Sequence, residues 1–332
     1  MTTGNQSSPD MAELALRLGN IFVPHHQQQL VDHFRGQTHA RFVHYTSADA
    51  ALQIIESKRL WMRNTNCMAD YREVQHGFDI LSRFFSDTAK QKAFTDVLDA
   101  CTPGAAQEAF QIFGKWSNDI RFNTYIAAIS EHDDAEDSFG RLSMWRAFGG
   151  SVGRVGIVMS VPLATMATTP LGILFNPVAY LSEKEAHYVL TDVIANVNAE
   201  RTYLQSVDHK HIVSAVFAML LAGVVCLKHA GFREEREWRV IYSPERAPSP
   251  LIDSATEVIR GIPQIIHKLP LDASVSESIA DLDLVRLFDR LIIGPSAYPW
   301  PMYQAFVGAL KNAGIADADK RVVCSDIPIR QT

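Results

Sequence analysis

Two glutamates two residues apart, Glu235 and Glu237, are the side chains of this sequence best suited to chemistry. They lie in the segment Glu235-Arg236-Glu237-Trp238-Arg239, at the start of a predicted strand. In an extended chain the two carboxylates project to the same side, where they repel, and the pKa of one of such a pair rises. This arrangement suits general acid–base catalysis, metal binding or stabilisation of a cation-like transition state. The alternative is a solvated strand edge whose ion pairs contribute little.

A second group is His44-Tyr45-Thr46-Ser47, where a predicted strand meets a helix that Thr46 or Ser47 caps. Such junctions present side chains and helix N-terminal amides to polar ligands. His44 is suited to hydrogen-bonding a sugar hydroxyl and Tyr45 to stacking on a ring. The alternative is a core histidine followed by an ordinary helix cap.

A third group could hold a metal ion. Glu73 and His76 are three residues apart, so a helix places them on one face, and Asn66 and Asp70 precede them. No second Glu-x-x-His accompanies them. The alternative is a loop followed by an acid that favours the helix dipole.

Trp145 lies in the segment Ser143-Met144-Trp145, which Gly149-Gly150 and a predicted strand at 153–161 follow. This glycine-rich stretch lacks the G-K-S/T ending of a phosphate loop. It is a tight turn beside a core tryptophan, or one wall of a site.

Composition argues against several classes of protein, although nucleic-acid binding through a local patch stays open. The chain has 332 residues, 47% hydrophobic, with a formal net charge of −6, so no basic excess indicates nucleic acid or an anionic membrane. Its four cysteines form no C-x-x-C pair. The longest apolar run, Ile212 to Leu227, is too short to cross a bilayer, and the polar start does not resemble a signal peptide. We therefore expect a cytoplasmic protein with no membrane partner.

The order of elements predicts an α+β fold with short strands in a mixed sheet and a helical insertion or flank. Residues 1–37 form an N-terminal helical arm, and residues 38–330 form one elaborated α+β domain. Helical segments are expected at about 86–122 and 183–230. Strands are predicted at 41–45, 60–62, 123–130, 153–161, 178–181, 238–242, 290–293 and 321–325, with two more within 258–269.

The ordered motifs together resemble a bacterial family called domain of unknown function 2971. They run from H-Y-T-S and I-I-E-S-K-R-L-W-M through I-S-E, L-S-M-W and E-R-E-W-R to I-I-G-P, between Phe42 and Arg330. The family name states no activity.

A more distant resemblance supplies a mechanism. His44-Tyr-Thr-Ser, followed by Ile54-Ile55, is similar to the opening of ADP-ribosyltransferases, and Glu235-Arg-Glu237 is similar to their E-x-E motif. This resemblance implies the ADP-ribosyltransferase fold and an enzyme that consumes NAD, a glycosyltransferase of the ADP-ribosyl-transferring type. The enzyme would modify a protein or a nucleic acid, as a toxin or an anti-phage effector. NAD would be the substrate and no metal would be needed.

The same resemblance implies roles for individual residues. Glu237 would bind the ribose 2′-hydroxyl and stabilise the oxocarbenium-like centre, and Glu235 would orient the acceptor. The NAD-binding residues would be His44, Tyr45, Thr46, Ser130 and Trp145, with Tyr45 or Trp145 stacking on nicotinamide.

Two other functions remain open at this point. One is a metal-dependent nuclease or hydrolase that uses Asp70, Glu73, Glu235 and Glu237. The other is a non-catalytic binding or sensor module in which E-R-E-W-R forms a structural ion-pair network with Arg41 or Arg141.

Overall fold

The computed structural model describes residues 8–68, 73–148, 153–163 and 169–328. It has the predicted α+β fold with a mixed sheet. The chain divides into two compact units: residues 1–32, 69–122 and 177–232 form unit 1, and residues 33–68, 123–176 and 233–332 form unit 2. The helix α2 (Pro24–Phe34) carries the chain from the first unit into the second.

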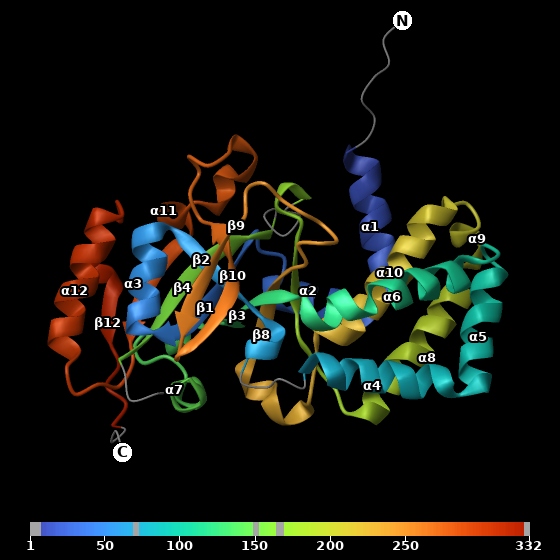
Figure 1. The fold of residues 1–332 in the computed structure, drawn as a ribbon, viewed down its shortest axis with the longest axis horizontal. Helices are drawn as coiled ribbons and strands as arrows, with labels where there is room; N and C mark the ends of the chain where they lie inside the picture. Colours follow the sequence, from blue (N-terminus) through green and yellow to red (C-terminus); the bar gives the residue numbers. More distant parts are fainter. Residues whose placement is uncertain (1–7, 69–72, 149–152, 164–168, 329–332) are drawn as a thin grey trace, which may run out of the picture. The chain divides into compact units, whose positions relative to one another are not determined.

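The described residues of unit 1 are mostly helical (Figure 1). They include a short pair of parallel strands, β6 and β7. Both predicted helical segments, 86–122 and 183–230, belong to this unit. Its other elements are α1 (Ser8–Phe22), α4 (Glu73–Ser86), α5 (Thr88–Asp99), α6 (Ala105–Phe122), β6 (Ala179–Tyr180), α8 (Glu183–Ala199), α9 (Arg201–Leu204), α10 (His209–Val225) and β7 (Leu227–Lys228).

The apolar helix α10 is the centre of unit 1, and it packs against α4 and α6. Its residues Ile212, Val216 and Val224 are fully buried. At the crossing with α4, a Cβ added to Gly77 would lie 2.5 Å from the carbonyl oxygen of Gly223. Only glycine fits this contact, because backbone cannot move aside as a side chain can.

Unit 2 is built on a ten-stranded sheet with the order β12-β11-β4-β1-β3-β2-β10-β9, and β8 pairs with both β3 and β5. Its strands are β1 (His39–Ser47), β2 (Arg59–Asn64), β3 (Tyr125–Glu131), β4 (Arg154–Pro162), β5 (Ile173–Pro177), β8 (Glu237–Tyr242), β9 (Asp253–Ile259), β10 (Ile262–Pro270), β11 (Phe288–Ile293) and β12 (Val322–Cys324).

Short helices connect these strands. The α-helices of unit 2 are α3 (Ala48–Ser57), α7 (Leu142–Ala147), α11 (Leu284–Leu287), α12 (Pro299–Asn312) and α13 (Ala318–Arg321). The 3-10 helices are η1 (Thr65–Cys67), η2 (Asp134–Glu136), η4 (Thr169–Leu171), η5 (Ala230–Glu235), whose first residues belong to unit 1, and η6 (Glu277–Leu282).

Local sequence explains two of the junctions in unit 2. Ser47 caps α3, because its side chain accepts a hydrogen bond from the Ala50 amide. Arg260 and Gly261, with φ of 53° and 80°, form the two-residue turn between β9 and β10. These two strands pair with each other antiparallel. Positive φ at both positions is typical of the hairpin turns whose twist matches that of the strands.

Strand β3 is shared between three partners. It pairs with β8 from Tyr125 to Ser130. Its other edge pairs with β1 at Ser130 and Glu131, and with β2 at Tyr125 and Ile126. The strands β1 and β2 therefore pair with the same edge of β3 at its two opposite ends.

Candidate functional site

Three neighbouring strands of unit 2 carry the predicted histidine, serine and glutamate at adjacent backbone positions. Val43 of β1 is opposite Ser130 of β3, and Ser130 is opposite Glu237 of β8. Facing residues in antiparallel strands have Cα atoms about 4.5–5.5 Å apart and project to the same face. Ser130 and Glu237 therefore share a face of the sheet, and His44, next to Val43, belongs to the opposite face.

His44 lies where β1 separates from β3. Its Nδ1 atom is 2.8 Å from the carbonyl oxygen of Ala128. Burial lowers the pKa of His44, and the hydrogen bond to Ala128 opposes this shift. A neutral imidazole at this position, with Nδ1 donating to the carbonyl, keeps Nε2 as a hydrogen-bond acceptor.

Glu237 forms a buried ion pair. Its side chain is 6% exposed and that of Arg239 is 1% exposed, and Arg239 Nε donates to Glu237 Oε1 at 2.7 Å. A second contact joins Arg239 Nη2 to Glu237 Oε2 at 3.4 Å. The two residues are on the same face of β8, so alternation along the strand brings carboxylate and guanidinium together.

The two glutamates do not form the predicted same-side pair of an extended chain. Glu235 is the last residue of η5, and Arg236 has a φ of 45° in the left-handed region. The extended strand begins only at Glu237. That expectation was wrong because the chain turns between the two carboxylates, which sequence spacing alone does not reveal. The half-buried Glu235 offers its carbonyl oxygen to Arg141 Nη1 at 3.3 Å.

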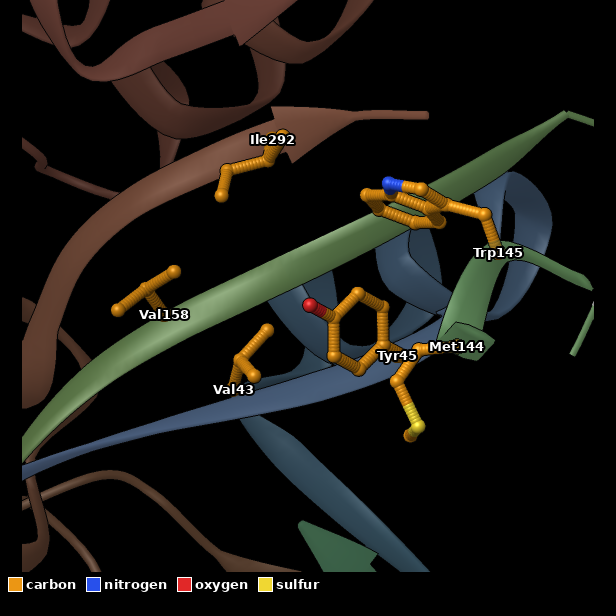
Figure 2. Close-up of a cluster of buried hydrophobic side chains, with 6 residues drawn as sticks. All are labelled: Val43, Tyr45, Met144, Trp145, Val158 and Ile292. Atoms are coloured by element: carbon orange, nitrogen blue, oxygen red, sulfur yellow. The ribbon is translucent and has the colours of Figure 1, made fainter. Parts of the chain in front are cut away.

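Tyr45 and Trp145 pack against each other in a buried cluster with Val43, Met144, Val158 and Ile292 (Figure 2). Their rings meet edge to face, with centroids 4.8 Å apart. Trp145 Nε1 donates to the carbonyl of Phe139 at 2.7 Å, and the Tyr45 hydroxyl accepts from the Arg141 amide at 2.9 Å. Burial raises the pKa of Tyr45 to about 12. Because both rings fill the core, we assign neither a stacking role on nicotinamide.

The other residues that the sequence singled out, Thr46, Ser130 and Trp238, lie in the strands β1, β3 and β8. Thr46 is a half-buried residue of β1 opposite Val155 of β4, and the cap of α3 is Ser47 rather than Thr46. Ser130 is 2% exposed. Trp238 is fully buried, and its Nε1 donates to Glu131 at 3.0 Å.

The acidic loop at 131–137 is the part of the site that the sequence did not predict. Four arginines hold it, and one of them, Arg290, contacts Asp137 at 3.1 Å. Arg236 contacts Glu131 at 3.0 Å and Asp133 at 2.6 Å, and Arg141 contacts Glu136 at 2.9 Å. Arg41 contacts Asp134 at 2.6 Å and Asp137 at 2.7 Å. The hydrogen bond from Arg236 lowers the pKa of Asp133. The excess of acids in this loop, with arginines elsewhere, was the only available signal.

The buried His132 completes this loop. Its side chain is fully buried, and its Nε2 lies 2.9 Å from Asp137. Its Nδ1 is buried without a hydrogen-bond partner, 3.6 Å from Glu136. Burial lowers the pKa of His132, while the hydrogen bond with Asp137 opposes the shift. Burial therefore favours the neutral imidazole, although charged groups surround it.

The proposed metal ligands are only partly described. Asp70 lies outside the described residues, as do Gly149 and Gly150, and the side chain of Glu73 is also not described. Asn66 belongs to unit 2 and His76 to unit 1, where the His76 ring is 6.4 Å from that of His229. Among the residues that the structure describes, no three His, Cys, Asp or Glu side chains gather as a metal site.

Residues 144–240 match the model of a family described as "Protein of unknown function (DUF2971)". This confirms the predicted resemblance to that family. The match includes Trp145 and the whole E-R-E-W-R segment. No curated protein and no solved structure matches the chain. Within the described part of the chain, no helix has the length and apolar character needed to span a membrane.

Proposed function

We propose that this chain is an NAD-consuming enzyme with a fold and mechanism like those of ADP-ribosyltransferases. The observation that supports this proposal most is the adjacency of β1, β3 and β8, which carry His44, Ser130 and Glu237 at neighbouring positions in the ladder. The three residues are far apart in the sequence, so the adjacency of their backbone positions does not follow from chain proximity.

In this proposal NAD binds where β1 leaves β3. In the described residues, β1 and β2 pair only with the two ends of one edge of β3. The His44 ring contacts the carbonyl of Ala128, which lies between those two ends. His44 would hold the adenosine side of NAD. Ser130 and Glu237 project to the other face of the sheet, so the proposal requires the nicotinamide ribose to reach that face past the end of the β1–β3 ladder.

The proposed reaction needs positioning and a negative charge more than an acid or base. Nicotinamide leaves with the electron pair of its bond to the ribose C1′, and positive charge develops on the sugar. The Glu237 carboxylate would bind the ribose 2′-hydroxyl and stabilise that charge. A nucleophile on a protein or nucleic acid, oriented by Glu235, then bonds to C1′ and loses its proton.

The proposed Glu237 role has a structural requirement. The carboxylate lies in a buried pair with Arg239, so substrate binding must exchange part of that contact for the ribose hydroxyl. Arg239 is thereby a positioning residue, since the orientation of its guanidinium fixes that of the carboxylate.

The test is incubation of the full chain and a cell extract with NAD labelled in its adenosine part. Label should transfer to a macromolecule or free nicotinamide should rise, and Glu237→Gln should lower either signal about 100-fold or more. Glu235→Gln is the matched control, and it should keep nicotinamide release while reducing transfer to the acceptor. The melting temperature of each variant separates lost chemistry from lost folding.

A specific observation favours a second function, a non-catalytic binding or sensor module. His44 and Glu237 belong to opposite faces of the sheet, and Arg236 joins the E-R-E-W-R segment to the acidic loop. Under this function Glu237→Gln lowers the melting temperature, and no NAD turnover occurs with any acceptor. Nucleic-acid cleavage that a chelator abolishes would instead support a metal-dependent hydrolase.

A further inference from the structure

A second group of reactive side chains lies in unit 1, whereas the strands that carry the proposed NAD site belong to unit 2. Thr102 is in the loop between α5 and α6, Glu108 is in the first turns of α6, and His209 is the first residue of α10. The Thr102 hydroxyl is 2.9 Å from His209 Nδ1. His209 Nε2 is 2.9 Å from a Glu108 carboxylate oxygen. A hydroxyl, an imidazole and a carboxylate thus form a continuous hydrogen-bonded row.

The direction of these hydrogen bonds follows from the groups themselves. An ionised carboxylate only accepts, so Glu108 places the imidazole proton on Nε2. Nδ1 of a neutral His209 then carries the lone pair, and the Thr102 hydroxyl donates to it. This is the arrangement in which a carboxylate orients a histidine and the histidine withdraws the proton of a nucleophile.

The surrounding backbone holds the hydroxyl in place. The Thr102 amide donates to the Leu98 carbonyl, and the Thr102 carbonyl accepts from the Ala105 amide. Asp208 caps α10 with a hydrogen bond to the Lys210 amide, which fixes the start of the helix that bears His209. Thr102 is therefore held by its loop, His209 by the start of α10 and Glu108 by α6.

Two members of the row are exposed to solvent and the third is buried. The side chain of His209 is 41% exposed and that of Glu108 is 53% exposed, whereas Thr102 is 9% exposed. The loop continues through the exposed residues Pro103 and Gly104, and a Cβ added to Gly104 would meet nothing within 4 Å.

We infer that Thr102, His209 and Glu108 form a nucleophilic site for small activated carboxylic esters. Thr102 Oγ attacks the ester carbonyl carbon while His209 Nδ1 takes the hydroxyl proton. The bond from the carbonyl carbon to the leaving oxygen then breaks, and the imidazolium returns its proton to that oxygen. Water, deprotonated by His209, hydrolyses the acyl-threonine and restores the free hydroxyl.

The experiment uses the full chain with p-nitrophenyl acetate. Release of nitrophenol should begin with a burst of about one equivalent, and mass spectrometry of acid-quenched protein should place an acetyl group on Thr102. Thr102→Val, which keeps the shape and removes the hydroxyl, should lower the rate about 100-fold. Thr102→Ser should retain it, and Glu108→Gln should lower it about tenfold.

Free imidazoles hydrolyse this ester slowly by themselves, so the matched control is His211→Ala, two residues along the same helix. It should leave the burst unchanged, and His209→Ala should remove it. The inference is overturned if Thr102→Val hydrolyses the ester as fast as the unchanged chain, or if no acetyl group is found on Thr102. The acetyl mapping is done on the unsubstituted protein, so a variant that fails to fold does not affect it.

Discussion

Arg236 and Arg239 are three residues apart in one segment, yet they form two different kinds of ion pair. Arg239 is 1% exposed and contacts the buried Glu237, on the same strand. Arg236 is 31% exposed, has a left-handed backbone and contacts Glu131 and Asp133 from another part of the chain. The comparison shows that burial, rather than the number of charges, decides how much each arginine matters. A buried charge that loses its partner costs far more than a screened one.

The largest effect is expected from Arg239→Met. The substitution leaves the Glu237 carboxylate buried without its guanidinium contact, so the free energy of unfolding should fall by about 3–5 kcal/mol. Urea denaturation measures this loss. Converting both residues to apolar ones, Arg239→Met with Glu237→Leu, should recover most of it. A single variant within about 1 kcal/mol of the unchanged chain would contradict a buried, mutually dependent pair.

A smaller effect is expected from Arg236. Arg236→Ala should lower the free energy of unfolding by about 1 kcal/mol, and 0.5 M salt should reduce the difference because partly exposed pairs are screened. Arg236→Gly should be about 1 kcal/mol more stable than Arg236→Ala, since glycine adopts a φ of 45° without strain. Denaturation of both variants at two salt concentrations tests this. Equal stability of the two variants would show that the left-handed backbone is not retained.

The smallest effect is a pH dependence from the buried His132 at the acidic loop. Burial lowers its pKa below the ordinary 6.5, so the folded state favours the neutral ring. Its contribution to stability is complete above pH 6.5 and is lost as the pH falls through the folded-state value. The groups that face it are Asp137, Glu136 and Arg41.

His132→Gln, which cannot titrate, should therefore reduce the decline in unfolding free energy between pH 6.5 and 5 by less than about 1 kcal/mol. Below that range Asp133 contributes as well, because its hydrogen bond with Arg236 lowers its pKa in the folded state. The unfolding free energy should therefore fall further as the pH falls toward that lowered pKa. A pH series of denaturation curves measures both. An unchanged slope in His132→Gln would mean that the histidine is not coupled to folding.

Much of the fold follows from short-range patterns. The periodicity of 86–122 and 183–230 predicts helices, and α5, α6, α8 and α10 lie there. Ser47 and the Arg260-Gly261 turn mark local boundaries whose chemistry is contained in a few residues. The strand β5 was not predicted, because its five residues, Ile173–Pro177, show no clear alternation and gain their pairing from the distant β8.

The candidate site was harder to predict, since its contacts are long-range. Nothing near Arg41 in the sequence indicates that it reaches Asp289, 248 positions later. Tyr45 and Trp145 read equally well as site walls or core residues until their edge-to-face contact is seen. The left-handed Arg236 also carries no local signal, because arginine rarely adopts that conformation.

The shared strand β3 has a consequence for the way this protein is made. A ribosome completes β3 at Glu131, but the partner Trp238 emerges 107 positions later. Residues 177–232, which belong to the other unit, are synthesised in between. During that interval the edge of β3 that later pairs with β8 has no partner strand, and an unpaired edge is a template for pairing with other chains. The nascent chain therefore carries this unpaired edge while α8, α9 and α10 of unit 1 are being translated.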